Sequence, residues 1–233
     1  MRLHRFITAL DLSQSNGIIS DPDLLHQWTK VLRLHTGDTV VLCDGKGMEV
    51  KGTLRSLDRK HATVQLESQH PVGAEPDRSV TLYCAVLKRE NFEWVVQKCT
   101  ELGIKAIIPI VTTRTVKTGL KMERLRMIAR EAAEQSGRGI VPVISEPMEF
   151  DRALEEGKNT RNLFFHTLTN QQTSKPANEQ TPLGIWVGPE GGWTEEEVMK
   201  AKDAGFAIAS LGALTLRAET AAIIAVYVGL HHV

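Results

Sequence analysis

Two segments near the end of the sequence have the residue types of ligand-binding loops: residues 188–192 (GPEGG) and 211–221 (LGALTLRAETA). Each follows a predicted strand, and in an open α/β sheet ligands bind at the carboxyl ends of the strands. A glycine there, such as Gly191, lets the backbone approach a ligand closely. Taken alone, GPEGG is more often an ordinary tight turn before a helix. Neither segment has the G-K-[ST] of a P-loop or a G-x-G-x-x-G fingerprint, which argues against nucleotide hydrolysis and dinucleotide chemistry.

The second segment also brings two charged residues, Arg217 and Glu219, to the start of a very apolar helix. A charge in such surroundings costs free energy unless it is paired or used. Glu219 has a simple structural explanation, because a carboxylate in the first turn of a helix complements the helix dipole. Arg217 has no comparable explanation, so we predict that it is a functional group.

Beyond residue 73, strand and helix patterns alternate, which indicates an α/β domain with a mainly parallel sheet. Strands are predicted at residues 80–86, 104–111, 163–166, 183–187 and 206–211. Helices are predicted from Asn91 as the cap to Gly103, over 121–136, from a capping box at Thr194 to Gly205, and over 218–231. The polar stretch 167–182 is predicted to be a loop.

The first 72 residues have a different pattern, with β-rich segments at 6–10, 39–44, 48–57 and 61–68. A short helix capped by Asp21 or Asp23 interrupts them. Short strands with one helix indicate a small β-barrel. Two prolines and a glycine at 71–76 then mark a boundary, which predicts domains at residues 1–72 and 73–233.

The last predicted helix, 218–231, is apolar on nearly every side, unlike an exposed amphipathic helix. It is too short to span a bilayer. Such a helix is either central to its domain or shared with a second subunit.

The net charge is zero, from 28 basic and 28 acidic residues, but the charges are unevenly distributed. Residues 78–139 hold 12 Lys and Arg against 6 Asp and Glu, whereas residues 140–233 hold 7 against 12. A basic middle section can bind a polyanion locally, although a solvated helix face explains it equally well. Three isolated cysteines point to a reducing compartment, here the cytoplasm, and argue against a disulfide framework or zinc site. We expect neither a signal peptide nor a membrane span.

Five segments together are more specific than any one of them: 31–47 (VLRLHTGDTVVLCDGKG), 92–116 (FEWVVQKCTELGIKAIIPIVTTRTV), 134–138 (EQSGR), GPEGG and 211–222 (LGALTLRAETAA). In order and spacing they resemble the bacterial family that methylates N3 of a uridine in small-subunit ribosomal RNA. This family is a branch of the SPOUT superfamily of knotted methyltransferases. The resemblance covers nearly the whole chain.

The resemblance implies a C-terminal domain with a trefoil knot and a PUA-like N-terminal barrel that binds RNA. It also implies a homodimer, which would account for the apolar last helix, with Ile223, Ile224 and Val226 at the interface. The cofactor would be S-adenosylmethionine, leaving S-adenosylhomocysteine as product. Its implied binding residues are His166, Val187, Gly188, Glu190, Gly191, Leu211, Gly212, Leu216 and Thr220.

The implied chemistry needs no metal, because the sulfonium methyl group is already activated. Uridine N3 must lose a proton, so negative charge develops on the uracil oxygens. We assign stabilisation of that charge to Arg217. A second hypothesis is that Glu219 accepts the N3 proton, although its interaction with the helix dipole explains its presence equally well. The residues expected to bind ribosomal RNA are Arg2, His4, Arg5, Lys88, Arg89, Gln135 and Arg138.

Two other functions are also consistent with the sequence. A related knotted methyltransferase could act on transfer RNA or on a ribose 2′-hydroxyl group. A non-catalytic RNA-binding assembly factor could keep the same fold and bind the cofactor without transferring the methyl group. A nucleotide-dependent oxidoreductase is disfavoured because the dinucleotide fingerprint is missing.

Overall fold

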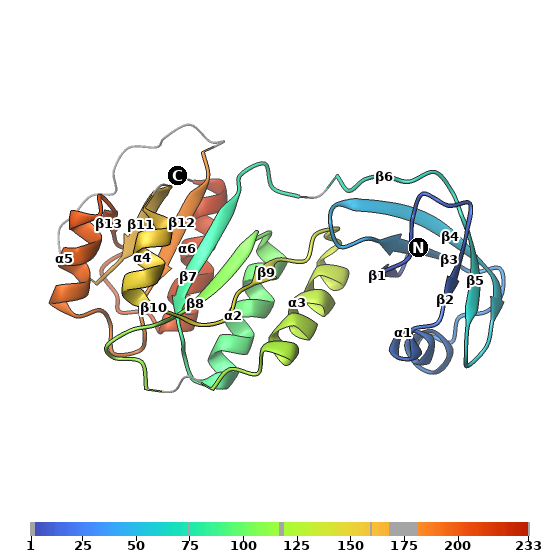
Figure 1. The fold of residues 1–233 in the computed structure, drawn as a ribbon, viewed down its shortest axis with the longest axis horizontal. Coiled ribbons are helices and arrows are strands. Elements are labelled where there is room, and N and C mark those ends of the chain that lie inside the picture. The colour runs from blue at the N-terminus through green and yellow to red at the C-terminus, as the bar shows by residue number, and fades with distance from the viewer. Residues whose placement is uncertain (1–2, 74, 117–118, 159, 168–180, 233) are drawn as a thin grey trace. The chain divides into compact units, whose positions relative to one another are not determined.

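The computed structural model describes residues 3–73, 75–116, 119–158, 160–167 and 181–232. It divides the chain into two compact units, which are described separately (Figure 1). The first unit comprises Met1–Glu75 together with Ala133–Val141, and the second comprises Pro76–Ala132 and Pro142–Val233. The domains at 1–72 and 73–233 remain a prediction, and no local sequence signal indicates that residues 133–141 pack with the first unit.

The first unit is built on one sheet, with the strand order β1-β3-β4-β5-β2 and β6 paired to β4. Its strands are β1 (Arg5–Ile7), β2 (Asn16–Ile19), β3 (Thr39–Cys43), β4 (Met48–Leu57), β5 (Ala62–Leu66) and β6 (His70–Pro71). Only the β1–β3 pair is parallel among these described pairings. No pairing joins the end strands β1 and β2 within the described residues, so closure of the barrel remains a prediction.

A hydrophobic core fills this unit beneath the sheet. Its largest member, Trp28, is fully buried and packs against Phe6 with 5.3 Å between ring centroids. Helix α1 (Pro22–His26) begins at Asp21, whose side chain accepts hydrogen bonds from the backbone of Asp23 and Leu24, which confirms the predicted cap. The helix continues as a π-helical turn, η1 (Gln27–Val31), which carries Trp28 into the core.

Residues 133–141 complete the first unit. Ala133 and Val141 pack against Ile7, Val41 and Cys43, which lie on β1 and β3. Burial raises the pKa of Cys43 to about 11, so this thiol is protonated at neutral pH. All three cysteines are free and buried.

The second unit is an α/β fold, as predicted, with a seven-stranded sheet in which every described pair is parallel. The strand order is β10-β8-β7-β12-β11-β13, with β9 paired to β8. The strands are β7 (Val80–Ala85), β8 (Ala106–Val111), β9 (Val143–Ile144), β10 (Met148–Glu149), β11 (Arg161–Phe165), β12 (Leu183–Val187) and β13 (Ala207–Ala209). Strands β9 and β10 were not predicted because two residues carry no periodic signal.

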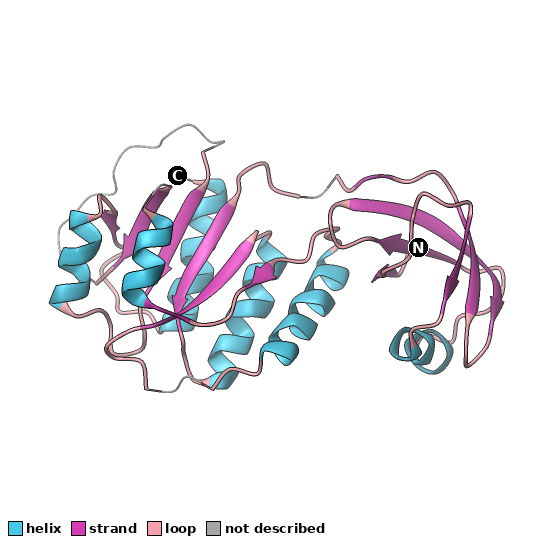
Figure 2. Cartoon of the chain, viewed as in Figure 1, coloured by secondary structure: helices cyan, strands magenta, loops and turns pink. Residues whose placement is uncertain are grey.

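Helices cover both faces of this sheet (Figure 2). The helices packed on the sheet are α4 (Phe150–Gly157), α5 (Glu195–Asp203) and α6 (Ala218–His231), and α2 (Arg89–Leu102) packs on α6. Helix α3 (Met122–Ser136) is divided between the units, because its residues from Ala133 onward belong to the first. Strand β12 shows why both faces are apolar: Trp186 packs with Phe150 of α4, whereas Ile185 faces Gly229 of α6. The capping box at Thr194 is confirmed, but helix α4 was missed. The polar stretch predicted as a loop lies mostly outside the described residues.

Two expectations about helices need correction. Helix α2 is capped by Lys88 rather than Asn91, because Asn91 lies inside the first turn, and its side chain donates to Glu219 across 3.4 Å. Val226 of α6 was expected at a subunit interface, yet it is fully buried within the chain because α6 packs on α2, β7 and β12. Helix α6 is therefore central to the second unit, while Ile224 and Tyr227 remain exposed.

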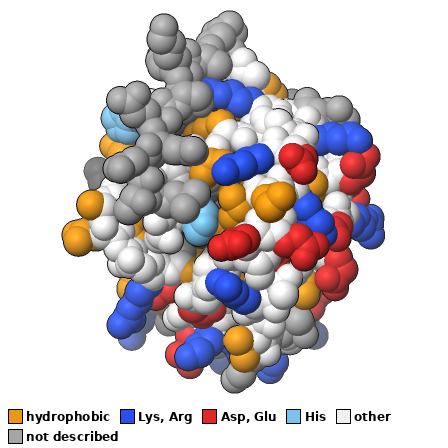
Figure 3. Space-filling view, turned by 90° about the vertical axis from the view of Figure 1, so that its left-hand side faces the viewer, with side chains coloured by type: hydrophobic (Ala, Val, Ile, Leu, Met, Phe, Trp, Pro, Cys, Tyr) orange, Lys and Arg blue, Asp and Glu red, His pale blue; other side chains and the backbone are white. Residues whose placement is uncertain are grey.

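Charged side chains on the α4–α5 face of this unit are intermixed rather than segregated (Figure 3). Lys200 pairs with Asp151 at 2.9 Å and with Glu196 at 3.1 Å, and Arg152 pairs with Glu156 at 2.9 Å. The acidic excess of the last part of the chain is thus partly neutralised on this face. In the described part of the chain, no helix has the length and apolarity needed to cross a membrane. No cluster of potential metal ligands occurs there either.

Candidate functional site

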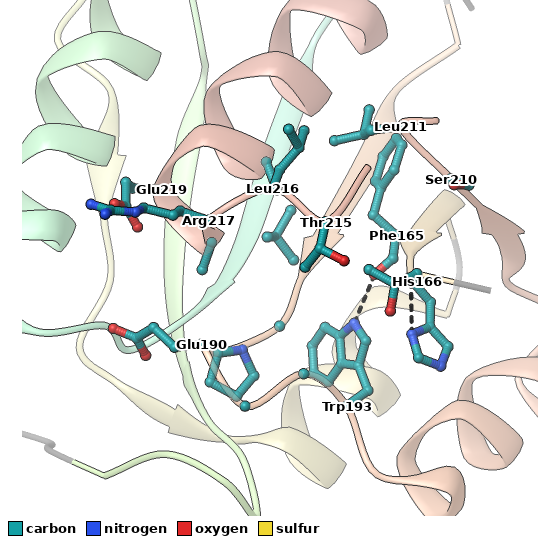
Figure 4. Close-up of a pocket in the computed structure, with 18 of the residues that line it drawn as sticks. Phe165, His166, Glu190, Trp193, Ser210, Leu211, Thr215, Leu216, Arg217 and Glu219 are labelled. Carbon is teal, nitrogen blue, oxygen red and sulfur yellow. Dashed lines mark hydrogen bonds between the residues drawn. The ribbon is translucent and has the colours of Figure 1, made fainter. Parts of the chain in front are cut away.

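A pocket of about 710 Å³ lies in the second unit, beyond the carboxyl ends of β11, β12 and β13 (Figure 4). This volume is in the range of small-molecule sites. Three stretches of chain form most of it: residues 165–167 after β11, 187–193 after β12, and 210–219 between β13 and α6. Lys88 and Asn91, at the start of α2, complete the wall. The two segments singled out by sequence therefore meet at one site.

The loop after β12 is a tight turn whose shape depends on glycine. Gly192 has a φ of +68°, and its N–H donates to the carbonyl of Pro189 at 2.8 Å. A Cβ on Gly188 would lie 3.0 Å from the indole of Trp193, so the indole would have to shift by a few tenths of an ångström. A Cβ on Gly191 would meet Arg114 at an ordinary 3.4 Å, so within the protein itself the stricter requirement falls on Gly188 and Gly192.

Trp193 joins this loop to the neighbouring strand. Its side chain is 4% exposed and stacks on Phe164 with 4.3 Å between ring centroids. The indole N–H donates to the carbonyl of Phe165 at 2.9 Å, where β11 ends (Figure 4). Sequence reasoning missed this residue, because a tryptophan beside a turn gives no local sign of its hydrogen-bond partner.

A second support comes from the turn that follows β8. Arg114 donates from Nη1 to the carbonyl of Gly191 at 2.7 Å and to that of Trp193 at 3.1 Å. Glu197, which is 4% exposed, accepts from the backbone N–H of Thr113 at 2.9 Å and of Thr194 at 2.8 Å. The capping box signalled the contact with Thr194, but nothing in the sequence pointed to Arg114 or Thr113.

The third wall leads into helix α6. Gly212 has a φ of +119°, and its N–H donates to Ser210 Oγ at 3.3 Å. Leu211 and Leu216 line the pocket from this segment, as does Phe165 from the end of β11. One part of the pocket is therefore apolar.

The opposite part is polar, with two basic and two acidic side chains. Arg217 is the N-cap residue of α6 and is exposed, and no hydrogen bond or ion pair of its guanidinium occurs among the described residues. Arg217 and Glu219 project to the same side of the pocket (Figure 4). Asn91 donates to Glu219 Oε2 at 3.4 Å, and the Lys88 backbone N–H donates to Glu190 Oε1 at 3.4 Å. Such a set can bind a polar planar group and hold or move a proton.

His166 lies at the other side of the pocket, at the end of β11. Its Nδ1 accepts a hydrogen bond from the Thr167 N–H at 2.9 Å, which places the ring proton on Nε2 when the ring is neutral (Figure 4). Burial, with a smaller contribution from Lys202, lowers the pKa of His166 below its ordinary value of 6.5.

The pocket brings together most of the residues singled out by sequence. Arg217 and Glu219 line it, as do all the expected cofactor residues except Thr220, which is exposed on α6 and lies outside the lining. Lys88, expected to bind RNA, also lines the pocket, whereas Arg89 beside it pairs with Glu93 at 3.1 Å.

The other residues expected to bind RNA belong to the first unit. His4 and Gln135 are exposed, Arg5 is paired with Glu49, and Arg2 lies outside the described residues. Arg138 is buried, with 4% of its surface exposed, and its guanidinium binds the carboxylate of Glu75 at 2.8 Å. An RNA contact by these residues remains a prediction, and the ion pair gives Arg138 a structural role.

Comparisons with known proteins agree with this geometry. Residues 74–229 match a family model for an RNA methyltransferase domain, and residues 29–67 match one for an RNA methyltransferase PUA domain. Ribosomal RNA small subunit methyltransferase E of Synechocystis sp. is 37% identical over 86% of this chain and 68% of that protein. Its namesake from Bacillus subtilis is 31% identical over 84% of this chain and 83% of that protein.

Solved structures are similar along the whole chain. Ribosomal RNA small subunit methyltransferase E of Neisseria gonorrhoeae, bound to S-adenosylmethionine, has a TM-score of 0.88 at 28% identity and covers 97% of this chain and 95% of its own. A methyltransferase of Legionella pneumophila, also with this cofactor, has a TM-score of 0.89 at 30% identity, with coverages of 98% and 97%.

Proposed function

The chain belongs to the RNA methyltransferase family, and from this premise we propose that it methylates N3 of a uridine in small-subunit ribosomal RNA. It is an S-adenosylmethionine-dependent RNA methyltransferase. The observation that carries the finer proposal is the polar part of the pocket, where Arg217 and Glu219 lie beside the apolar part. We further propose that the two domains are a PUA-like barrel at residues 1–72 and a trefoil-knotted domain at 73–233.

The residues of the pocket fit this cofactor. The pocket has a volume of about 710 Å³, which is enough for the cofactor together with a base. The walls at Leu211 and Leu216 are apolar, and at Gly188 an added Cβ would press on the indole of Trp193 at 3.0 Å. We assign cofactor binding to His166, Val187, Gly188, Glu190, Gly191, Leu211, Gly212 and Leu216, and keep Thr220 as a prediction.

The bound cofactor supplies an activated methyl group, so the chain's own residues have to prepare the uridine. Uridine presents two carbonyl oxygens on either side of the N3–H group, and negative charge spreads onto those oxygens as the proton leaves. The Arg217 guanidinium, which has no partner among the described residues, is available to stabilise that charge. Glu219 is available to accept the N3 proton, and Asn91 orients its carboxylate.

The direct test is to incubate the protein with labelled S-adenosylmethionine and small ribosomal subunits, and then to locate the label in the RNA. Subunits from cells that lack the enzyme should be used, together with naked ribosomal RNA and transfer RNA. We expect the label on N3 of one uridine of the ribosomal RNA. Label on a ribose or in transfer RNA would favour the related knotted enzymes. Tight cofactor binding with no label in any RNA would favour the assembly factor.

Cofactor affinity is expected to depend on pH through His166. The lowered pKa keeps this ring neutral at pH 7, and protonation would remove the acceptor for Thr167 and add a positive charge to a pocket that has to bind a cationic cofactor. Affinity should therefore fall as the pH drops through the lowered pKa and level off at higher pH, where the ring is neutral. Calorimetry from about pH 5 to about pH 7.5 on the wild type and His166→Asn tests this. An equal pH dependence in both proteins would contradict it.

We also propose a homodimer that uses the exposed side of α6. Ile224 and Tyr227 are 38% and 46% exposed there, although the helix is apolar along its length. Ile224→Asp is expected to give a monomer in sedimentation at micromolar concentration. Met199→Asp is the control, because Met199 is an exposed apolar residue on α5. A wild-type protein that sediments as a monomer would contradict the proposal.

A further inference from the structure

We propose that Arg114 is a positioning residue, which holds the loop at residues 188–193 in the conformation that binds the cofactor without contacting the cofactor itself. This inference rests on the proposed use of the pocket for S-adenosylmethionine. Arg114 is absent from the residues that line the pocket, yet its guanidinium binds two carbonyls of the loop that forms it. Arg114 therefore acts on the site through this loop and not by lining the pocket.

The two carbonyls belong to Gly191 and Trp193, and they flank Gly192. Both bonds come from the same nitrogen, Nη1, at 2.7 and 3.1 Å, so one group fixes the direction of two peptide units. A hydrogen bond from a charged donor is stronger than one between neutral groups. The aliphatic part of Arg114 also packs close to Gly191, since a Cβ built there would lie 3.4 Å from Arg114 Cδ.

The loop needs such support because its own bonding is sparse. Within residues 188–192, the one backbone hydrogen bond found among the described residues joins Gly192 to Pro189. Glycines lose more conformational freedom on ordering than any other residue, so a loop with three of them is costly to fix. Trp193 fixes the far end of the loop through its indole bond to Phe165. Arg114 holds the turn itself, through the carbonyls of Gly191 and Trp193.

Arg114 can do this because its own turn is held in place. The Thr112 N–H donates to Thr115 Oγ1 at 2.9 Å, and the Thr115 N–H donates to the Thr112 carbonyl at 3.0 Å. The buried carboxylate of Glu197 then ties Thr113 to the start of helix α5. Two independent links, one through Arg114 and one through Glu197, therefore join the turn after β8 to the segment after β12.

Loss of Arg114 should lower the fraction of molecules whose loop is ready to bind. If that fraction falls to about one in ten, the apparent dissociation constant of the cofactor rises about tenfold. The turnover number at saturating cofactor should stay within about twofold of the wild type, because bound cofactor selects the competent loop. Lysine should restore part of the affinity, since its ammonium can also donate to two carbonyls but is a strongly hydrated point charge on a flexible stem.

The experiment compares Arg114→Ala and Arg114→Lys with Arg126→Ala as matched control. Arg126 is a similarly exposed arginine of the same unit, with bonds to Glu123 at 3.1 Å and to Glu146 at 2.9 Å. Cofactor affinity is measured by calorimetry without RNA, and melting temperature is measured on the same samples. Hydrogen exchange of a peptide spanning 188–194, without ligand, reports the loop directly.

We expect a roughly tenfold weaker affinity and faster exchange only in Arg114→Ala, partial recovery in Arg114→Lys, and equally small melting shifts in both alanine variants. Wild-type affinity in Arg114→Ala would overturn the inference, and so would an equal loss in Arg126→Ala. A lower turnover number with unchanged affinity would also overturn it, by assigning Arg114 to the chemistry. Failure of the wild type to bind the cofactor would instead refute the proposed function, and this inference with it.

Discussion

Arg217→Ala is expected to lower single-turnover methylation by roughly two to three orders of magnitude, which is what loss of one charge-stabilising donor costs. The affinity for S-adenosylmethionine should change much less, because an interaction with charge that develops in the transition state adds nothing to cofactor binding. The structure supports this separation of effects. Arg217 is exposed at the start of α6 and has no side-chain partner in the described part of the chain whose loss would disturb the fold.

Arg217→Lys is the informative companion variant. It should recover only part of the rate, because an ammonium is a point charge and cannot present two donors in one plane. Cofactor affinity, melting temperature and single-turnover rate should be measured on the same preparations. If affinity falls in proportion to rate, Arg217 fixes the cofactor loop and the catalytic assignment is wrong.

Arg138→Ala is expected to destabilise the first unit by about 3 kcal/mol, the lower end of what removing one partner of a buried ion pair costs. Arg138 Nη2 lies 2.8 Å from Glu75 Oε2, and the two side chains are only 5% and 16% exposed. The other Glu75 oxygen accepts from the backbone N–H groups of Gly139 and Ile140, each at 3.1 Å. In Arg138→Ala, the Glu75 carboxylate would stay buried but would have lost its positively charged partner.

Chemical denaturation of the full chain measures this effect, with hydrogen exchange in β3 and β4 locating it in the first unit. Arg55→Ala is the control, because Arg55 is exposed and bonds to the Gln65 side chain at 2.7 Å, so its loss should cost less than about 0.5 kcal/mol. A role of Arg138 in RNA binding would give a different result in these measurements. Loss of a phosphate contact leaves stability unchanged and lowers the salt dependence of RNA binding by about one ion.

The parts of the fold that were predictable are those with strong local signals. Strand β12, the capping box at Thr194 and helix α6 each follow from residue periodicity or a local motif. Helix α4 was missed because it has only eight residues, and β9 and β10 because they have two each. Asn91 has the residue type of a cap, but helix α2 begins before it.

The residues of the site also divide into those with a local sequence signal and those without one. Gly188 and Gly212 were found because glycines after strands are a local pattern, and the resemblance to a known family supplied the cofactor. Arg114 and Trp193 were missed because their effect comes from partners distant in sequence: 77 residues separate Arg114 from Gly191, and 28 separate Trp193 from Phe165. Arg138 was predicted from its charge and the resemblance, whereas its burial depends on Glu75, 63 residues earlier.

The grouping of residues 133–141 with the first unit has a consequence for the order in which the chain folds during synthesis. When Glu75 leaves the ribosome, Ile7, Val41 and Cys43 have been made, but Ala133 and Val141, which cover them, have not. The intervening 66 residues, 76–141, take about 3 to 13 seconds to synthesise at typical rates. Through that interval the nascent first unit exposes an apolar patch and a Glu75 carboxylate that lacks Arg138. A chaperone that binds nascent chains would have its best opportunity there.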